Sequence, residues 1–116
     1  MSPNRGSVGL GADFEGFSVT VRSEGNGRTV AVSGELDLAT QAQFERALTG
    51  ALVRGTRELV IDLTALDFID ATGIGALMRY SHKARRRGIH ISISLGDGEP
   101  RRALALSGLI DTFDLI

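Results

Sequence analysis

The residues of this chain best suited to chemistry lie in one short run that follows an apolar segment. Asp67, Asp70 and Thr72 stand there, followed by Gly73 and Gly75. If a helix begins in this run, a carboxylate, a hydroxyl and free backbone N–H groups meet at its start. That combination can hold an anion or receive a phosphoryl group, which makes Thr72 a candidate phosphate acceptor. A local hydrogen bond at the helix entrance is the other role for this hydroxyl, and chemistry alone favours it.

Asp70 has the residue type and the position of an N-cap. Its carboxylate would accept the backbone amide of Thr72 or Gly73 and leave Ala71 and Thr72 as the first two helical residues. Gly73 and Gly75 lower helix stability, so their presence in the first turn predicts a close approach by another segment or by a partner protein.

The elements on either side position this run. The apolar stretch 59–63 predicts a strand inside a parallel sheet with both of its faces covered. A helix is predicted from about Asp70 to Arg87, with Ile74, Leu77, Met78 and Ser81 at helical spacing. In open α/β sheets, ligands and partners bind at the carboxyl ends of such strands.

The remaining elements follow from periodicity and turn residues. Alternation predicts a β-hairpin over 17–32 with its turn at 23–27, and a further strand over 89–93. An apolar stripe from Phe44 to Leu52 predicts a helix, with a capping box formed by Thr40 and Gln43. A short helix is predicted over 101–107, with Pro100 in its first turn. The predicted order is β-β-α-β-α-β-α, a mixed sheet covered by helices.

Composition narrows the class of protein. The 116 residues suffice for one domain, and the net charge of −1 gives no general reason to bind nucleic acid or an anionic membrane. No cysteine is present, and no apolar run approaches the roughly 18 residues of a spanning helix. We expect residues 1–16 to form a flexible tail and residues 17–116 the domain of a cytoplasmic protein without membrane insertion.

Several kinds of catalytic or ligand site are not supported. Gly73 and Gly75 lack the third glycine of a dinucleotide motif, because Met78 takes its place. Asp62, Asp67 and Asp70 have no histidine at ligand spacing, so no metal site is predicted. No nucleophile motif is present. We therefore expect neither an enzyme nor a cofactor.

The histidines and the basic run also have plain interpretations. His82 and His90 are expected to be exposed. Lys83 and the arginines 85–87 fall in the last turns of a predicted helix, where cations interact favourably with the helix dipole. No aromatic residues are interleaved with them, so this run does not predict a nucleic-acid partner.

Three motifs, in order, resemble the STAS domain of bacterial anti-sigma factor antagonists. They are Gly34-Glu35-Leu36-Asp37 with Thr40, the junction Asp70-Ala71-Thr72-Gly73, and Leu106-Ser107-Gly108-Leu109. The resemblance spans residues 17–116 and implies a mixed sheet with helices mainly on one face. Many members of the family continue into a further helix beyond the position of Ile116.

The resemblance implies a protein-binding switch. Members bind an anti-sigma factor, usually a serine kinase with an ATP site, so that a sigma factor is released for transcription. The kinase phosphorylates the residue after the junction aspartate, which breaks the complex, and a serine phosphatase restores it. The implied contact surface here is Gly34, Glu35, Asp37, Asp70, Ala71, Thr72 and Gly73.

Ala71 departs from that pattern, because it stands at the usual acceptor position and has no hydroxyl. The protein could bind its partner without phospho-control, or be phosphorylated at Thr72. Alternatively, it could be a nonphosphorylated scaffold or regulatory subunit of a signalling or lipid-transport complex. A shift of one residue rotates a helical side chain by about 100°, which favours the first interpretation.

Overall fold

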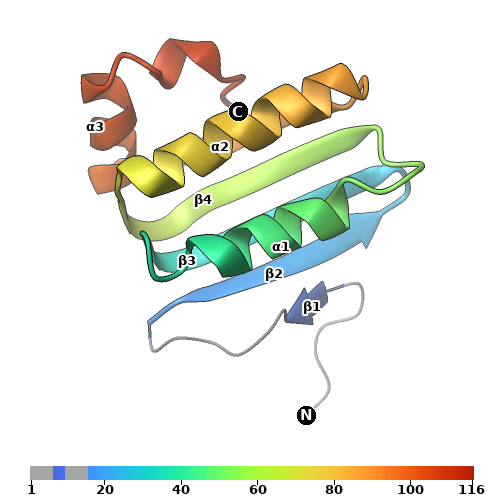
Figure 1. Cartoon of the computed structure of the whole chain (residues 1–116), viewed down its shortest axis with the longest axis horizontal. Helices are drawn as coiled ribbons and strands as arrows, with labels where there is room; N and C mark the ends of the chain where they lie inside the picture. The colour runs from blue at the N-terminus through green and yellow to red at the C-terminus, as the bar shows by residue number, and fades with distance from the viewer. Residues whose placement is uncertain (1–6, 10–15) are drawn as a thin grey trace.

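The computed structural model describes residues 7–9 and 16–116, which form one five-stranded sheet in the order β1-β2-β3-β4-β5 (Figure 1). β1 pairs antiparallel with β2 and β2 antiparallel with β3, whereas β3, β4 and β5 run parallel. The strands are β1 Ser7–Gly9, β2 Ser18–Glu24, β3 Gly27–Leu36, β4 Glu58–Ile69 and β5 His90–Leu95.

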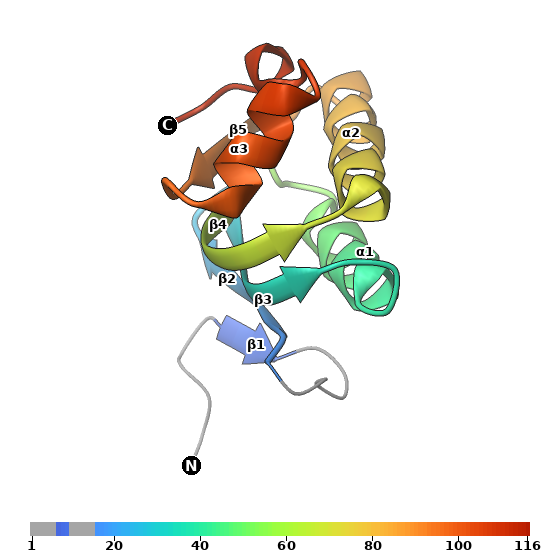
Figure 2. The ribbon, with the colours of Figure 1, turned by 90° about the vertical axis from the view of Figure 1, so that its left-hand side faces the viewer.

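Two helices lie side by side over one face of this sheet (Figure 2). They are α1 (Gln41–Ala51) and α2 (Ala71–Arg86), and each is the crossover between two parallel strands. The shorter α3 (Glu99–Leu106) contacts β4 and is followed by the 3-10 turn η1 (Ile110–Thr112). From β2 to α3 the order is the predicted β-β-α-β-α-β-α, so the predicted mixed α/β fold is confirmed.

The structure adds a strand inside the segment expected to be a flexible tail. Ser7–Gly9 pairs with β2, with Val8 opposite Val21. Three residues are too few to show the alternation that reveals a strand in a sequence, and the open edge of β2 provides the pairing groups. The sequence interpretation did not include this strand, and residues 1–6 and 10–15 lie outside the described part of the chain.

β4 is longer than the predicted strand 59–63, and only one of its faces is fully buried. Leu59, Ile61 and Leu63 are buried, whereas Asp62 is half-buried and Thr64 is exposed. The expectation of two covered faces is therefore wrong. Side chains of β4 over 59–63 alternate between a buried and a less buried face, as in a sheet whose two faces are not equally covered.

The helices bury the faces that their apolar spacing predicts, with one adjustment. α1 packs Phe44, Ala47, Leu48 and Ala51 into the core, as predicted. In α2, Ile74 and Met78 lie at the margin of the core, so the buried face is rotated slightly from the predicted one. The residues of α2 that are buried are Gly73, Ala76, Leu77, Tyr80, Ser81 and Ala84.

The carboxyl-terminal segment closes the edge of the sheet at β5. Ile93 and Leu115 form a parallel bridge, with the Ile93 amide donating to the Asp114 carbonyl at 2.8 Å. None of the helices within 7–9 and 16–116 is long and apolar enough to cross a membrane.

Candidate functional site

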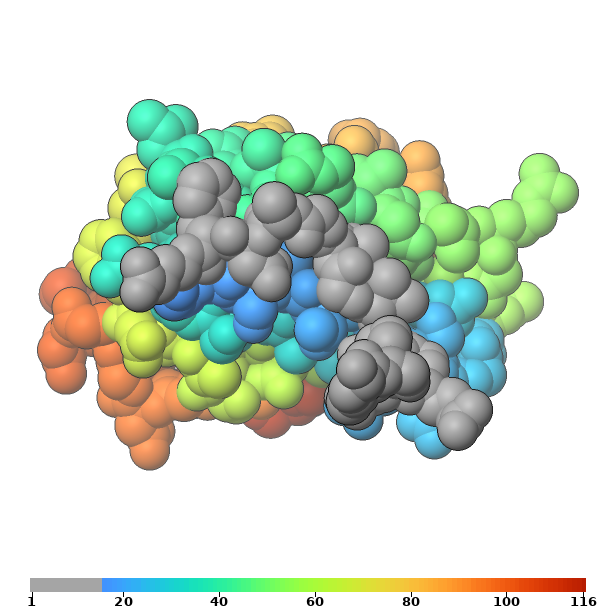
Figure 3. Space-filling view, turned by 90° about the horizontal axis from the view of Figure 1, so that it is seen from below, coloured from blue at the N-terminus to red at the C-terminus, as the bar shows by residue number. Residues whose placement is uncertain are grey.

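The carboxyl ends of β3 and β4 are direct neighbours and bring two loops together. Leu36 pairs with Ile69, and the next amide, that of Asp70, donates to the Leu36 carbonyl at 3.1 Å. The loop after β3 (37–40) therefore lies beside the start of α2. The space-filling view shows the teal segment after β3 and the yellow β4–α2 junction at the same end of the molecule (Figure 3).

Asp70 caps α2 as predicted. Its Oδ1 accepts the Gly73 amide at 3.0 Å and the Thr72 hydroxyl at 2.6 Å. Burial opposes ionisation, but the hydrogen bonds from the Thr72 hydroxyl and from the amides of Gly73, Thr72 and Leu38 outweigh it and lower the pKa of Asp70. The carboxylate therefore remains charged at neutral pH.

This cap gives a stability prediction. We expect Asp70→Ala to lower the free energy of unfolding by about 1 kcal/mol at neutral pH, because the Gly73 amide and Thr72 hydroxyl lose their acceptor. Asp70→Asn keeps an acceptor oxygen but cannot ionise, so we expect a smaller loss. Urea denaturation followed by circular dichroism measures both variants.

The pH dependence follows from the direction of the pKa shift. A carboxyl whose pKa is lowered in the folded state contributes stability that is complete above its ordinary value of 3.8 and is lost as the pH falls through the lower folded-state value. The gap in stability between wild type and Asp70→Asn should therefore narrow in acid. A gap that stays constant between about pH 7 and about pH 3 contradicts the assignment.

The loop after β3 is organised by Asp37 and Thr40, and the predicted capping box is wrong. Asp37 Oδ1 accepts the amides of Ala39 and Thr40 at 3.0 and 3.2 Å. The Thr40 hydroxyl donates to the Glu35 carbonyl at 2.8 Å and accepts the Asp37 amide at 3.0 Å, and it makes no cap hydrogen bond. Thr40 is buried and its hydroxyl closes the loop, so it cannot also cap the helix.

Two glycines of the predicted surface are buried and shape the backbone. A Cβ on Gly73 would lie 2.8 Å from Ile69 Cγ1 and 2.9 Å from Leu36 Cγ, so this glycine allows α2 to approach the ends of both strands. A Cβ on Gly34 would lie 1.6 Å from the Gly16 carbonyl oxygen. The close approach predicted for Gly73 is confirmed, and it is made by the sheet. Near Gly75 only the Arg79 side chain is close, at 3.4 Å.

The surface at this edge is acidic. Glu35 and Ala71 are exposed, whereas Asp37, Asp70 and Thr72 are half-buried. A hollow of about 390 Å³ is lined in part by Glu35, Asp37 and the exposed Asp67. None of these carboxylates forms an ion pair with another described residue. The edge is therefore complementary to a cationic partner surface and opposes a second negative charge.

No three potential metal ligands gather within the parts of the chain that the structure describes. The two histidines are exposed, as predicted, and His90 lies 3.9 Å from Asp114.

The sequence interpretation missed two apolar residues at this edge. Leu38 is 74% exposed and follows Asp37 directly, and Phe68 is 42% exposed two residues before Asp70. A large apolar residue in a loop of turn-forming residues is the signal that could have revealed Leu38. Exposed apolar groups beside unpaired charges are typical of protein-binding surfaces.

Fold and site together are those of a small mixed α/β domain with a capped strand–helix junction at an acidic edge. The chain belongs to the STAS domain family, whose profile matches residues 18–116.

Several proteins that this chain resembles are named anti-sigma factor antagonists. It is 30% identical over 101 residues to the anti-sigma-F factor antagonist RsfB of Mycobacterium tuberculosis, covering 87% of this chain and 82% of RsfB. The crystal structure of an anti-sigma factor antagonist from Mycobacterium paratuberculosis matches with a TM-score of 0.78 and 28% identity, over 85% of this chain and 84% of that one. Unphosphorylated SpoIIAA, at 16% identity and a TM-score of 0.70 over 84% of this chain and 87% of its own, shares the fold.

Proposed function

We propose that this chain is an anti-sigma factor antagonist, which binds an anti-sigma factor and so releases a sigma factor for transcription. The observation that carries the proposal is the capped β4–α2 junction, held against the Asp37 loop at an acidic edge. The names of RsfB and of the Mycobacterium paratuberculosis protein support the same role.

The contact surface of the proposed complex consists of Glu35, Asp37, Asp70, Ala71 and Thr72. These residues are exposed or half-buried and share one edge. Gly34 and Gly73 belong to the same site, but they are buried and act by fixing the backbone. The proposed partner is a cytoplasmic anti-sigma factor of the serine-kinase type with an ATP site.

We further propose that binding is free of phospho-control. Ala71 is exposed at the first position of α2 but offers no hydroxyl. The Thr72 hydroxyl is half-buried and donates its proton to Asp70 at 2.6 Å. A phosphoryl group on Thr72 would remove this donor and place a dianion beside a carboxylate. If the chain is never phosphorylated, no serine phosphatase is needed to restore the complex.

A second candidate function is favoured by Ala71 alone. A STAS domain without an acceptor hydroxyl could serve as a scaffold or regulatory subunit of a signalling or lipid-transport complex. In that case the acidic edge would bind a subunit of the complex and no anti-sigma factor.

A binding and phosphorylation experiment tests the proposal. The full chain is incubated with ATP and each serine-kinase-type anti-sigma factor of the organism, and intact mass and affinity are measured. We expect one anti-sigma factor to bind while the chain gains no phosphate, and the mass of Thr72→Ala to be equally unchanged by the incubation.

The other outcomes of this experiment are distinct. One phosphate that disappears in Thr72→Ala shows a switch at a shifted site and contradicts binding without phospho-control. Binding to none of the anti-sigma factors contradicts the antagonist function. The scaffold or regulatory subunit is then the remaining candidate function.

A further inference from the structure

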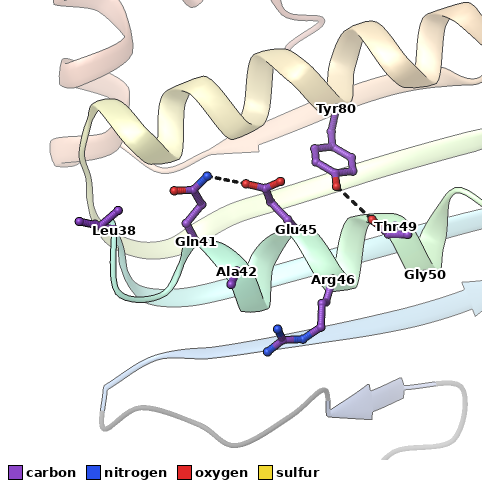
Figure 4. Close-up of a pocket in the computed structure, with 8 residues that line it drawn as sticks. All are labelled: Leu38, Gln41, Ala42, Glu45, Arg46, Thr49, Gly50 and Tyr80. Atoms are coloured by element: carbon purple, nitrogen blue, oxygen red, sulfur yellow. Dashed lines mark hydrogen bonds between the residues drawn. The ribbon is translucent and has the colours of Figure 1, made fainter.

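A groove of about 850 Å³ lies along α1, outside the proposed contact surface. It extends from Leu38, before the helix, to Gly50 in its last turn, and Tyr80 of α2 contributes to its lining (Figure 4). We call it the α1 groove. It is lined by Leu38, Gln41, Ala42, Glu45, Arg46, Thr49, Gly50 and Tyr80.

Interactions between the two helices hold the α1 groove in shape. The Tyr80 and Thr49 hydroxyls are 3.0 Å apart in a hydrogen bond, and Arg79 pairs with Glu45 at 2.7 Å. Gln41 donates to the same Glu45 (Figure 4). Because these polar groups already have partners, the groove offers a preformed surface on which apolar contact costs little desolvation.

Leu38 joins the α1 groove to the proposed contact surface. Its side chain lines the groove and is 74% exposed. Its backbone amide is one of the groups that lower the pKa of Asp70. Its neighbours Asp37 and Ala39 line the hollow at the acidic edge, so the groove and that edge share one loop, in which Leu38 is the exposed apolar group.

We propose that the α1 groove is the second half of the partner-binding surface and receives an apolar segment of the same anti-sigma factor. This inference rests on the proposed function. The segment packs on Leu38 and along α1, and basic side chains next to it face Glu35, Asp37 and Asp67. That choice follows from charge, because these three carboxylates pair with no described cation and line the hollow that Ala39 and Thr40, the residues after Leu38, also line.

Three variants of the full chain test the inference. Leu38→Asp replaces the apolar group at the entrance of the groove. Gly50→Gln fills its far end, where an added Cβ meets nothing within 4 Å and a helical residue replaces glycine without strain. Val53→Asp is the matched control, since Val53 is 44% exposed and does not line the groove.

Affinity for the purified serine-kinase-type anti-sigma factor is measured by calorimetry for each variant. We expect Leu38→Asp and Gly50→Gln to weaken binding about tenfold or more, and Val53→Asp to match wild type. If wild type binds and both groove variants bind equally well, the inference is overturned while the proposed function stands. If wild type binds no anti-sigma factor, both are overturned. If wild type self-associates in analytical ultracentrifugation and Leu38→Asp does not, the groove binds a second copy of the chain and the inference is overturned.

Discussion

Gly34→Ala is expected to lower the free energy of unfolding by about 2–5 kcal/mol, a large share of the 5–15 kcal/mol typical of a domain. Gly34 has φ +94°, a conformation that side-chain-bearing residues rarely adopt. An added Cβ would also lie 1.6 Å from the Gly16 carbonyl oxygen and 2.9 Å from the Phe17 Cα. Both contacts are with backbone, so no change of rotamer relieves them. Urea denaturation measures the loss.

Gly50→Ala is the matched control for this variant. Gly50 lies in α1, and an added Cβ meets nothing within 4 Å. We expect a gain of about 0.5–1 kcal/mol, because alanine is the better helix former. If Gly34→Ala is as stable as wild type, the backbone at Gly16 and Phe17 can move away from β3 without cost, and the role assigned to Gly34 is wrong.

The order of the elements could be predicted because each one carries a regular pattern. Alternation identified the hairpin of β2 and β3, and the apolar stripe of α1 gave the helix after it. β4 was predicted too short because its last residues, 64–69, are partly exposed and lose the apolar character of a buried strand. The register shifts in its pairing with β3 also break the alternation there.

The site could be predicted in part, since local chemistry is visible in a sequence and packing is not. Asp70 was identified as the cap because a carboxylate before a helix accepts amides of the first turn. Thr40 was misassigned, because its hydroxyl closes a loop with Glu35, a contact that depends on how β3 ends. The α1 groove arises where Tyr80 meets Thr49 from another helix, 31 positions away, and no local pattern reveals such a contact.

Ala71→Ser is expected to turn a chain that gains no phosphate into one that gains a single phosphate from the bound serine kinase. Within the proposed function, residue 71 is the position at which this kinase class acts, and it is exposed at the first position of α2. A serine there adds the missing hydroxyl without removing any contact of the Asp70 cap. Intact-mass analysis after incubation with ATP measures the gain.

The added phosphate is also expected to weaken binding to the anti-sigma factor about 100-fold or more. A charge of about −1.5 to −2 would then lie beside the ionised Asp70, at an edge that already carries Asp37 and Asp67. Like charges at a contact surface repel, and a partner surface suited to carboxylates and an alanine methyl has no room for a phosphate. Affinity measured without ATP, where Ala71→Ser should bind like wild type, separates the charge from the substitution itself.

Ala39→Ser is the matched control, because it places an exposed serine on the neighbouring loop rather than at the helix start. We expect it to gain no phosphate, since the kinase must reach the first turn of α2 beside the Asp70 cap. Equal phosphorylation of wild type and Ala71→Ser would show that Thr72 or another hydroxyl is the acceptor. Phosphorylated Ala71→Ser that binds as tightly as wild type would show that the partner does not contact this end of α2, and the contact surface would then have to lie elsewhere.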